Sequence, residues 1–239
     1  MSTEERKAEL AKALAEVEAR IERACAAAGR DRAEVRMLAV TKTFPATDAA
    51  LLTDLGVTDL AENRDQEAGP KAAEVAALRP DAEPRWHMVG RLQRNKAKSV
   101  VRWAGEVQSV DSARLADALD KAVTAQQRPP LDVLIQASLD DDPERGGCPL
   151  PELGALATRI ARAGGLRLRG LMAVAPLRAD PAEAFERLAR AAETLRHDHP
   201  GATELSAGMS GDLEQAIAHG STCVRVGTAL LGGRGLASP

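Results

Sequence analysis

Short apolar runs alternate with amphipathic segments along most of this chain. Residues 3–28 carry apolar side chains at helical spacing and are followed by Gly29, which predicts an N-terminal helix. Apolar runs of strand length then follow at residues 35–40, 57–61, 85–89, 106–110, 131–137, 166–174, 203–205 and 222–226. Segments of helical periodicity separate these runs, so the pattern predicts eight strands that alternate with helices.

Strands that alternate with helices pair in parallel, because each helix returns the chain to the same end of the sheet. Eight such units favour a closed barrel over the alternative, a doubly wound open sheet. No Pro/Gly/Ser-rich linker or break in composition divides the sequence. We therefore expect the α/β class, with a single (β/α)8 TIM barrel and an extra N-terminal helix in one domain over residues 1–239.

Composition narrows the compartment and the partners. The formal net charge of −3 argues against a general nucleic-acid binder. Three widely separated cysteines with no C-x-x-C pair give no metal motif and are typical of reduced thiols in the cytoplasm. The chain has neither a signal peptide nor an apolar run of the roughly 20 residues that a membrane span needs. Aromatic residues are only 2%, which leaves no obvious interface anchor, so we expect a monomer. The cysteines lead us to expect that it is cytoplasmic.

Two loops that follow the last two predicted strands combine glycine with hydroxyl side chains. Residues 206–211 contain Ser206 and Ser210, and Gly227 is followed by Thr228. Glycine lets the backbone approach a ligand closely, and barrels often hold phosphate at the loops after strands seven and eight. Two tight turns with helix caps are the alternative. The position in the strand order favours phosphate.

Lys42 directly follows the first apolar strand. A lysine in such a place can be desolvated, which lowers the pKa of its amine and makes it a nucleophile toward an aldehyde. On this residue alone, a rim lysine that only pairs or extends to solvent is the favoured alternative.

Other charged residues carry weaker signals. Arg225 lies on the last strand and, if it points inward, needs a phosphate, a ring nitrogen or a carboxylate such as Glu62. His87 lies inside a strand, which is more typical of a hydrogen-bonded core residue than of a base. The acidic run at residues 140–142 is more typical of a solvated loop than of a metal cluster. A basic group either meets an anion or, as the pattern favours, faces solvent; it comprises Arg91, Arg94, Lys96 and Lys98.

Five stretches of the sequence resemble one family. They are VTKT (residues 40–43), AEN (61–63), WHMVGRLQRNK (86–96), LRGLMAV (168–174) and LSAGMSGDLEQAIAHGSTCVRVGTALLG (205–232). In residues and order they are similar to the YggS/PROSC family of pyridoxal-phosphate homeostasis proteins. The resemblance implies the barrel of alanine racemase without that enzyme's second domain.

The resemblance also implies a site for pyridoxal 5′-phosphate (PLP). Lys42 matches the family lysine that forms the internal aldimine, and Arg225 matches an arginine beside the pyridine nitrogen, which keeps that nitrogen unprotonated. Asn63 and His87 match positions that line the pocket. The family's phosphate-binding segments contain Ser206, Ser210, Gly227 and Thr228.

Three positions depart from the family pattern. Thr41 replaces the usual serine and keeps its hydroxyl, whereas Arg64 replaces a tyrosine and removes any contact from that ring. Arg145 stands where the family often has a lysine, so a second, transfer-related aldimine is not available there.

The implied function is to hold PLP and deliver it within the cell, with PLP-requiring apo-enzymes as partners and no catalytic residue. A PLP-dependent amino-acid racemase is the alternative. A two-base racemase of this fold needs a tyrosine opposite the lysine, and this sequence has no tyrosine, so only a one-base mechanism stays open. A barrel aldolase that uses Lys42 on a sugar phosphate is a third possibility.

Overall fold

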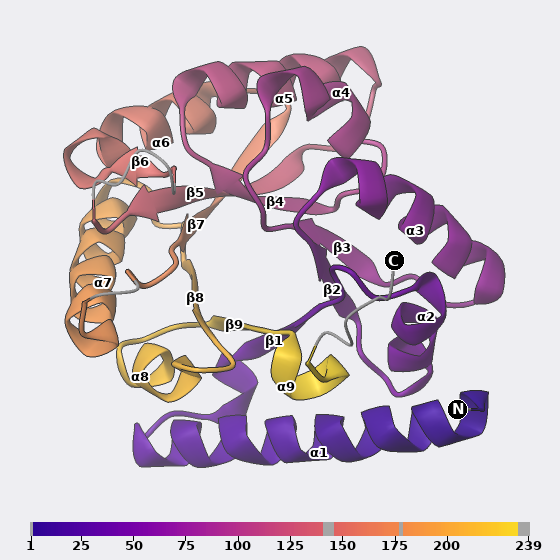
Figure 1. The fold of residues 1–239 in the computed structure, drawn as a ribbon. Helices are drawn as coiled ribbons and strands as arrows, with labels where there is room; N and C mark the ends of the chain where they lie inside the picture. Colours follow the sequence, from indigo (N-terminus) through magenta and orange to yellow (C-terminus); the bar gives the residue numbers. More distant parts are fainter. Residues whose placement is uncertain (1, 141–145, 177–178, 234–239) are drawn as a thin grey trace.

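The computed structural model describes residues 2–140, 146–176 and 179–233. Within these ranges, eight parallel strands form a closed barrel (Figure 1). Around the barrel they run β1 (Arg36–Val40), β2 (Asp59–Glu62), β3 (Arg85–Met88), β4 (Glu106–Val110), β5 (Leu131–Ser138), β7 (Leu166–Met172), β8 (Glu204–Met209) and β9 (Cys223–Val226). The barrel closes because β9 pairs with β1.

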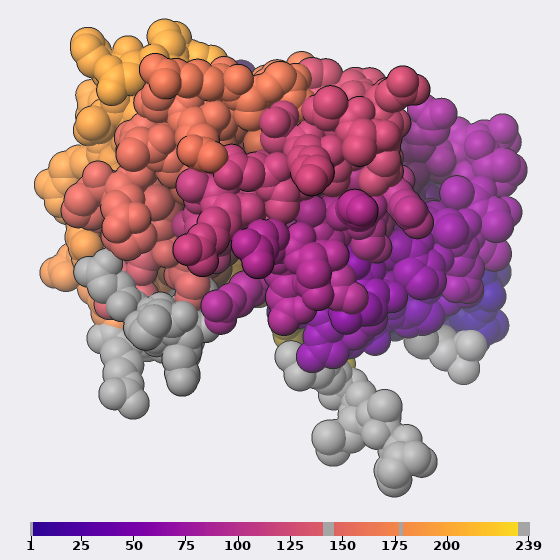
Figure 2. Space-filling view, turned by 90° about the horizontal axis from the view of Figure 1, so that it is seen from above, coloured from indigo at the N-terminus to yellow at the C-terminus, as the bar shows by residue number. Residues whose placement is uncertain are grey.

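Helices surround the barrel. They are α2 (Ala46–Asp54), α3 (Asp65–Leu78), α4 (Ala97–Val100), α5 (Ala113–Ala125), α6 (Leu153–Arg162), α7 (Pro181–Asp198), α8 (Leu213–Ala218) and α9 (Thr228–Leu231). Seen from above in Figure 2, the magenta to pink segments α4, α5 and α6 close one side of the molecule. The additional helix α1 (Thr3–Ala27) packs on α8, α9 and α2 (Figure 1).

Short elements complete the described chain. They are the 3-10 turns η1 (Arg32–Glu34), η2 (Arg94–Lys96) and η3 (Leu150–Glu152), and the two-residue strand β6 (Cys148–Pro149), which pairs with β5. No helix in the described ranges is long and apolar enough to span a bilayer.

Apolar side chains fill the space between the barrel and the helices. Leu52 of α2 and Leu60 of β2 are fully buried on one side of the barrel, and Ile135 and Leu188 are fully buried on the other. Inside the barrel the apolar cluster is small and includes Leu38 of β1. The rest of the interior carries buried polar side chains, so the inside of the barrel is more polar than the layer between the barrel and the helices.

Charged side chains lie at the amino-terminal ends of the strands. Arg36, the first residue of β1, contacts the carboxylates of Asp59, Glu106 and Glu204, which are the first residues of β2, β4 and β8. Charged side chains inside a closed barrel need such pairing, because burying an unpaired charge costs free energy. This network closes the end of the barrel opposite the rim that carries Lys42.

The structure confirms the predicted barrel and the leading helix. It differs in detail at two places. The strand predicted at residues 203–205 continues to Met209, because the small side chains that suggested a loop also fit the barrel wall. The helical segment expected between the strands at 85–89 and 106–110 is the 3-10 turn η2 followed by the short helix α4.

Candidate functional site

The carboxyl-terminal ends of β1, β8 and β9 lie side by side, because β9 pairs with both of the other strands. Lys42 follows β1, Ser210 follows β8, and Gly227 and Thr228 follow β9. A Cβ atom at Gly227 would lie 3.3 Å from the carbonyl oxygen of Val40, so the loop after β9 packs against the end of β1. The fold therefore brings these four predicted residues to one side of the rim.

Hydroxyl and amide groups face each other where the loops after β8 and β9 meet. The backbone N–H of Ala229 donates to Ser210 Oγ at 3.4 Å, and Arg20 of α1 donates to the Ser210 carbonyl at 2.6 Å. Thr228 is exposed and begins α9, which has no side-chain cap. Hydroxyls and uncapped backbone N–H groups are donors that suit an anion.

The Lys42 side chain is half-buried, and its amine makes no hydrogen bond or ion pair with a described residue. The next residue, Thr43, has φ of 68°, a left-handed conformation that is unfavourable for a β-branched residue. The turn that carries Lys42 is thus held by its surroundings rather than by its own preference.

A buried polar network holds this turn from behind. Glu62 is fully buried and accepts a hydrogen bond at 2.6 Å from the Thr41 hydroxyl and another at 2.6 Å from the Lys71 amine. Lys71 of α3 also donates to the carbonyl oxygen of Thr41 at 2.8 Å. Glu62 and Lys71 therefore fix the backbone directly before Lys42.

Lys71 was not predicted from the sequence as part of the site. Helical periodicity gives one signal, since Ala68, Lys71 and Val75 lie at spacings of three and four and all are buried in α3. A lysine on the apolar face of a helix needs a buried partner. Glu62 supplies it. The alternative in which Glu62 pairs with Arg225 is therefore not the arrangement in the structure.

Arg225 points into the barrel and is 4% exposed. Its guanidinium donates to the Ser206 hydroxyl and carbonyl, each at 2.8 Å, and to the carbonyl of Ala173 at 2.8 Å. Burial lowers the pKa of this guanidinium from its usual value. No carboxylate among the described residues pairs with Arg225, so it presents an uncompensated positive charge near the rim.

Asn63 follows β2 at the same rim. Its side-chain oxygen is buried and has no hydrogen-bond partner, which leaves an acceptor without a donor. Its backbone packs tightly against the next loop, because a Cβ atom at Gly90 would lie 2.2 Å from the Asn63 carbonyl oxygen.

Two predicted residues do not join the group at the rim. Ser206 lies within β8, fully buried, where its hydroxyl donates to Gln108 at 2.7 Å and accepts from Arg225. The strand extends past Ser206, so this hydroxyl belongs to the barrel interior rather than to a loop. Its contact with Arg225 still gives it a part in positioning that side chain.

His87 is fully buried on β3 and is directed toward the amino-terminal end of the barrel. Its ring nitrogens lie 3.1 Å from Glu106 and 2.8 Å from Asp59. This placement agrees with the hydrogen-bonded core residue that the sequence favoured and not with a residue lining a rim pocket.

Arg145 and residues 141–142 of the acidic run lie outside the described residues. The described part of the chain contains no cluster of metal-ligating side chains.

Comparison with known proteins places the chain in a family. The family model "Alanine racemase, N-terminal domain" matches residues 13–235. A protein of Mycobacterium bovis named pyridoxal phosphate homeostasis protein is 49% identical, over 98% of this chain and 96% of that protein.

Two solved structures extend the comparison. An unknown protein from Bifidobacterium adolescentis superposes with a TM-score of 0.89 at 31% identity, covering 96% of this chain and 97% of that chain. PipY of Synechococcus elongatus, a COG0325 family member solved with PLP bound, superposes with a TM-score of 0.80 at 34% identity, covering 93% and 100%. The chain therefore belongs to the pyridoxal phosphate homeostasis proteins, within the alanine racemase N-terminal domain family.

Proposed function

We propose that this protein binds PLP at the carboxyl-terminal rim of its barrel, covalently through Lys42, and serves in intracellular PLP homeostasis and delivery. The observation that carries the proposal is the group of Lys42, Ser210, Gly227 and Thr228 on adjacent strand ends, in a chain that belongs to this family. The relative PipY, which was solved with PLP bound, supports it.

The donor set of the rim fits the parts of the cofactor. Ser210 and Thr228 supply hydroxyls, and the loop at Gly227 supplies backbone N–H groups, for a phosphate. Lys42 supplies an amine that has no partner among the described residues and that would bond to the aldehyde of PLP, with loss of water. Arg225 supplies a buried cation, which disfavours a proton on a ring nitrogen beside it. PLP functions as an electron sink when bound in enzymes, and such an arginine weakens that property.

The same residues favour a carrier over an enzyme. No tyrosine is available anywhere in the sequence to act as a second base opposite Lys42. His87 is engaged at both ring nitrogens by Asp59 and Glu106, so it does not replace that base. We therefore expect no turnover of an amino acid, and transfer of PLP to apo-enzymes that require it.

The proposal includes the setting in which the protein works. The three cysteines are buried and unpaired, which suits the reducing cytoplasm. We expect a monomer, and sedimentation or light scattering of the purified protein at several concentrations measures this directly.

Covalent labelling tests the role of Lys42. Purified protein is saturated with PLP and treated with borohydride, and the modified peptide is identified by mass spectrometry. We expect the adduct on Lys42 and its loss in Lys42→Ala, whereas Lys98→Ala, which removes an exposed lysine, retains it. A reducible adduct of unchanged yield in Lys42→Ala would refute the assignment.

Two further measurements separate the carrier from the alternatives. Thr228→Ala should weaken PLP binding by about 1.5–3 kcal/mol, the value of a hydrogen bond to a charged group. Unchanged affinity would show that the phosphate lies elsewhere. Racemisation of alanine is measured in parallel, and clear turnover that depends on Lys42 would favour the one-base racemase instead.

A further inference from the structure

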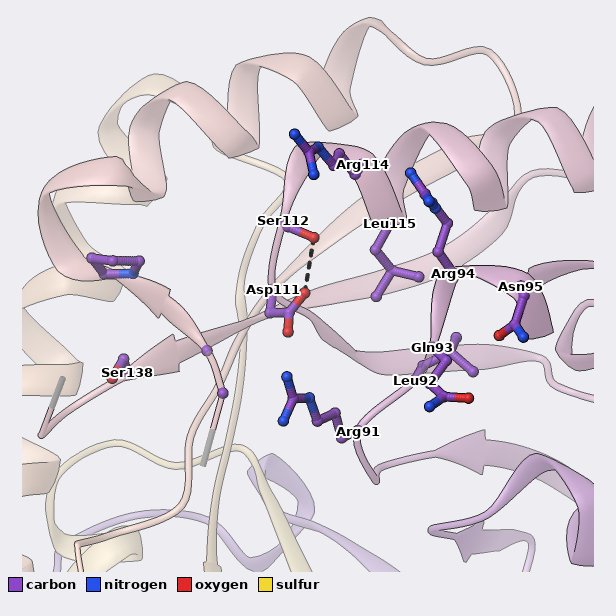
Figure 3. A pocket seen from close by; sticks show the side chains of 13 residues that line it. Arg91, Leu92, Gln93, Arg94, Asn95, Asp111, Ser112, Arg114, Leu115 and Ser138 are labelled. Atoms are coloured by element: carbon purple, nitrogen blue, oxygen red, sulfur yellow. Dashed lines mark hydrogen bonds between the residues drawn. The ribbon is translucent and has the colours of Figure 1, made fainter. Parts of the chain in front are cut away.

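A cavity opens at the rim on the side of β3, β4 and β5. It has a volume of about 880 Å³ and lies between the loop after β3, the start of α5 and the segment before β6 (Figure 3). This size is within the usual range for a small-molecule site. None of the residues assigned above to PLP lines it.

Three arginines from two separate segments line this cavity. Arg91 and Arg94 come from the loop after β3, and Arg114 comes from the first turn of α5. Among the described residues that line the cavity, Asp111 is the only acidic one, so their ionisable side chains carry a net positive charge, in a protein of net charge −3. Two members of the basic group noted in the sequence, Arg91 and Arg94, thus line the cavity together with Arg114, whereas Lys96 and Lys98 do not line it.

These arginines differ from most others in the described chain. Arginines such as Arg36 and Arg85 are held by carboxylates. By contrast, Arg91, Arg94 and Arg114 make no hydrogen bond or ion pair with a described residue. A ligand can therefore bind these guanidinium groups without first breaking a contact with a described residue.

The lining around the arginines suits an anion that carries an organic part. Ser112 precedes α5, but its hydroxyl donates to Asp111 at 3.0 Å instead of capping the helix, so the first N–H groups of α5 lack a side-chain acceptor. Leu92 and Leu115 are 6% and 3% exposed and form an apolar part of the wall. Backbone donors and guanidinium groups together bind phosphate well.

Gly146 keeps one side of the cavity open. Its φ is 69°, and a Cβ atom there would lie 3.6 Å from the Asp111 carboxylate and 4.0 Å from Arg91 Nε. A larger residue at this position would fill the space between these two side chains. Figure 3 shows the Asp111 and Arg91 side chains directed toward one another.

We propose that this cavity is a second ligand site, which binds a small phosphorylated molecule carrying at least two negative charges. Three guanidinium groups against one carboxylate among the described lining residues favour more than one negative charge on the ligand. The fork of an arginine matches two oxygens of a phosphate, which favours phosphate over a monovalent anion. The inference is independent of PLP binding, because none of the residues assigned to PLP lines this cavity.

Calorimetric titration with inorganic pyrophosphate tests the proposal. The protein is saturated with PLP, and the absorbance of the bound cofactor is followed in parallel. We expect saturable binding that is at least tenfold tighter than that of inorganic phosphate and leaves the cofactor absorbance unchanged. Loss of that absorbance would place pyrophosphate in the cofactor site and overturn the proposal. If the chain proved not to bind PLP, the same titration on the unloaded protein would still decide it.

Charge variants locate the site. Arg91→Gln and Arg114→Gln should each weaken pyrophosphate binding about tenfold or more, as expected for loss of a charge-assisted hydrogen bond. Asp111→Asn should strengthen it severalfold, because it removes the opposing charge. Arg102→Gln removes an exposed arginine that does not line the cavity, and it should leave the affinity within about twofold.

Two results would overturn the assignment. One is equal weakening by Arg102→Gln and Arg91→Gln, which would show that only the overall charge matters. The other is unchanged binding when Arg91 and Arg114 are both replaced by glutamine.

Discussion

The buried pair of Glu62 and Lys71 supports the turn that carries Lys42, and replacing Lys71 by methionine removes only the charged end of that support. Lys71 is 8% exposed and Glu62 is fully buried, with 2.6 Å between the amine and Glu62 Oε1. In Lys71→Met the carboxylate keeps one hydrogen bond, from the Thr41 hydroxyl. Its second oxygen is already buried without a partner. The variant therefore leaves an uncompensated charge in the interior.

The expected cost follows from burial. Removing one partner of a buried ion pair typically destabilises a protein by about 3–5 kcal/mol, because the other charge stays desolvated. Replacing both partners by apolar residues removes that penalty. In Glu62→Met/Lys71→Met the lost contacts are then the hydrogen bonds of Thr41, at about 1 kcal/mol each. We expect the double variant to lie within about 2 kcal/mol of the wild type.

Urea unfolding at pH 7 of the wild type, Glu62→Met, Lys71→Met and the double variant measures the coupling between the two residues. Lys71→Met should lower the free energy of unfolding by at least 3 kcal/mol, on the scale of about 3–5 kcal/mol for a broken buried pair. Lys98→Met, which replaces an exposed lysine, should change it by less than about 0.5 kcal/mol. The reasoning fails if Lys71→Met costs less than about 1 kcal/mol, or if the double variant costs the sum of the two single variants.

Two further predictions concern the barrel interior and the rim. Burial by itself would raise the pKa of Glu106, but the hydrogen bond and charge of His87 have the larger effect and lower this pKa from 4.5 to about 2. The pKa of Asp59 is also lowered, to about 2. A carboxyl group whose pKa is lower in the folded than in the unfolded state stabilises the protein at pH values above the unfolded-state pKa. For Glu106 this contribution to the free energy of unfolding is on the order of 3 kcal/mol, and it is lost as the pH falls from about 4.5 to 2. Urea unfolding across this range should show a shallower pH dependence in Glu106→Gln, and an unchanged slope would contradict the assignment. Gly90→Ala should destabilise the protein by about 1–3 kcal/mol, because the new methyl would meet the Asn63 carbonyl, which must shift. Thermal unfolding checks this against Gly154→Ala in α6, where nothing lies within 4 Å and alanine should stabilise the helix; equal effects of the two would contradict it.

Much of the candidate site was predictable because it depends on position along the strand order. The rhythm of apolar runs places Lys42, Ser210, Gly227 and Thr228 after strands, and parallel strands bring such positions to one rim. This reasoning needs only the number and direction of the strands. It does not require knowledge of which side chains touch.

The contacts inside the barrel were less predictable. Ser206 looked like a loop residue, yet it lies in the wall and bonds to Gln108, which is 98 positions earlier in the chain. Such a pair depends on the register between strands that are not neighbours in sequence. A shift of one residue would turn either side chain to the other face of the sheet.

The sequence by itself determined three features of the protein. Its periodicity predicted the barrel, its strand order predicted which residues lie at the rim, and its motifs indicated the family. The tertiary structure decided which charges meet. It paired Glu62 with Lys71 instead of Arg225, held His87 between two carboxylates, and added Arg114 to Arg91 across a cavity. These outcomes depend on distances between segments far apart in the chain, which only closure of the barrel fixes.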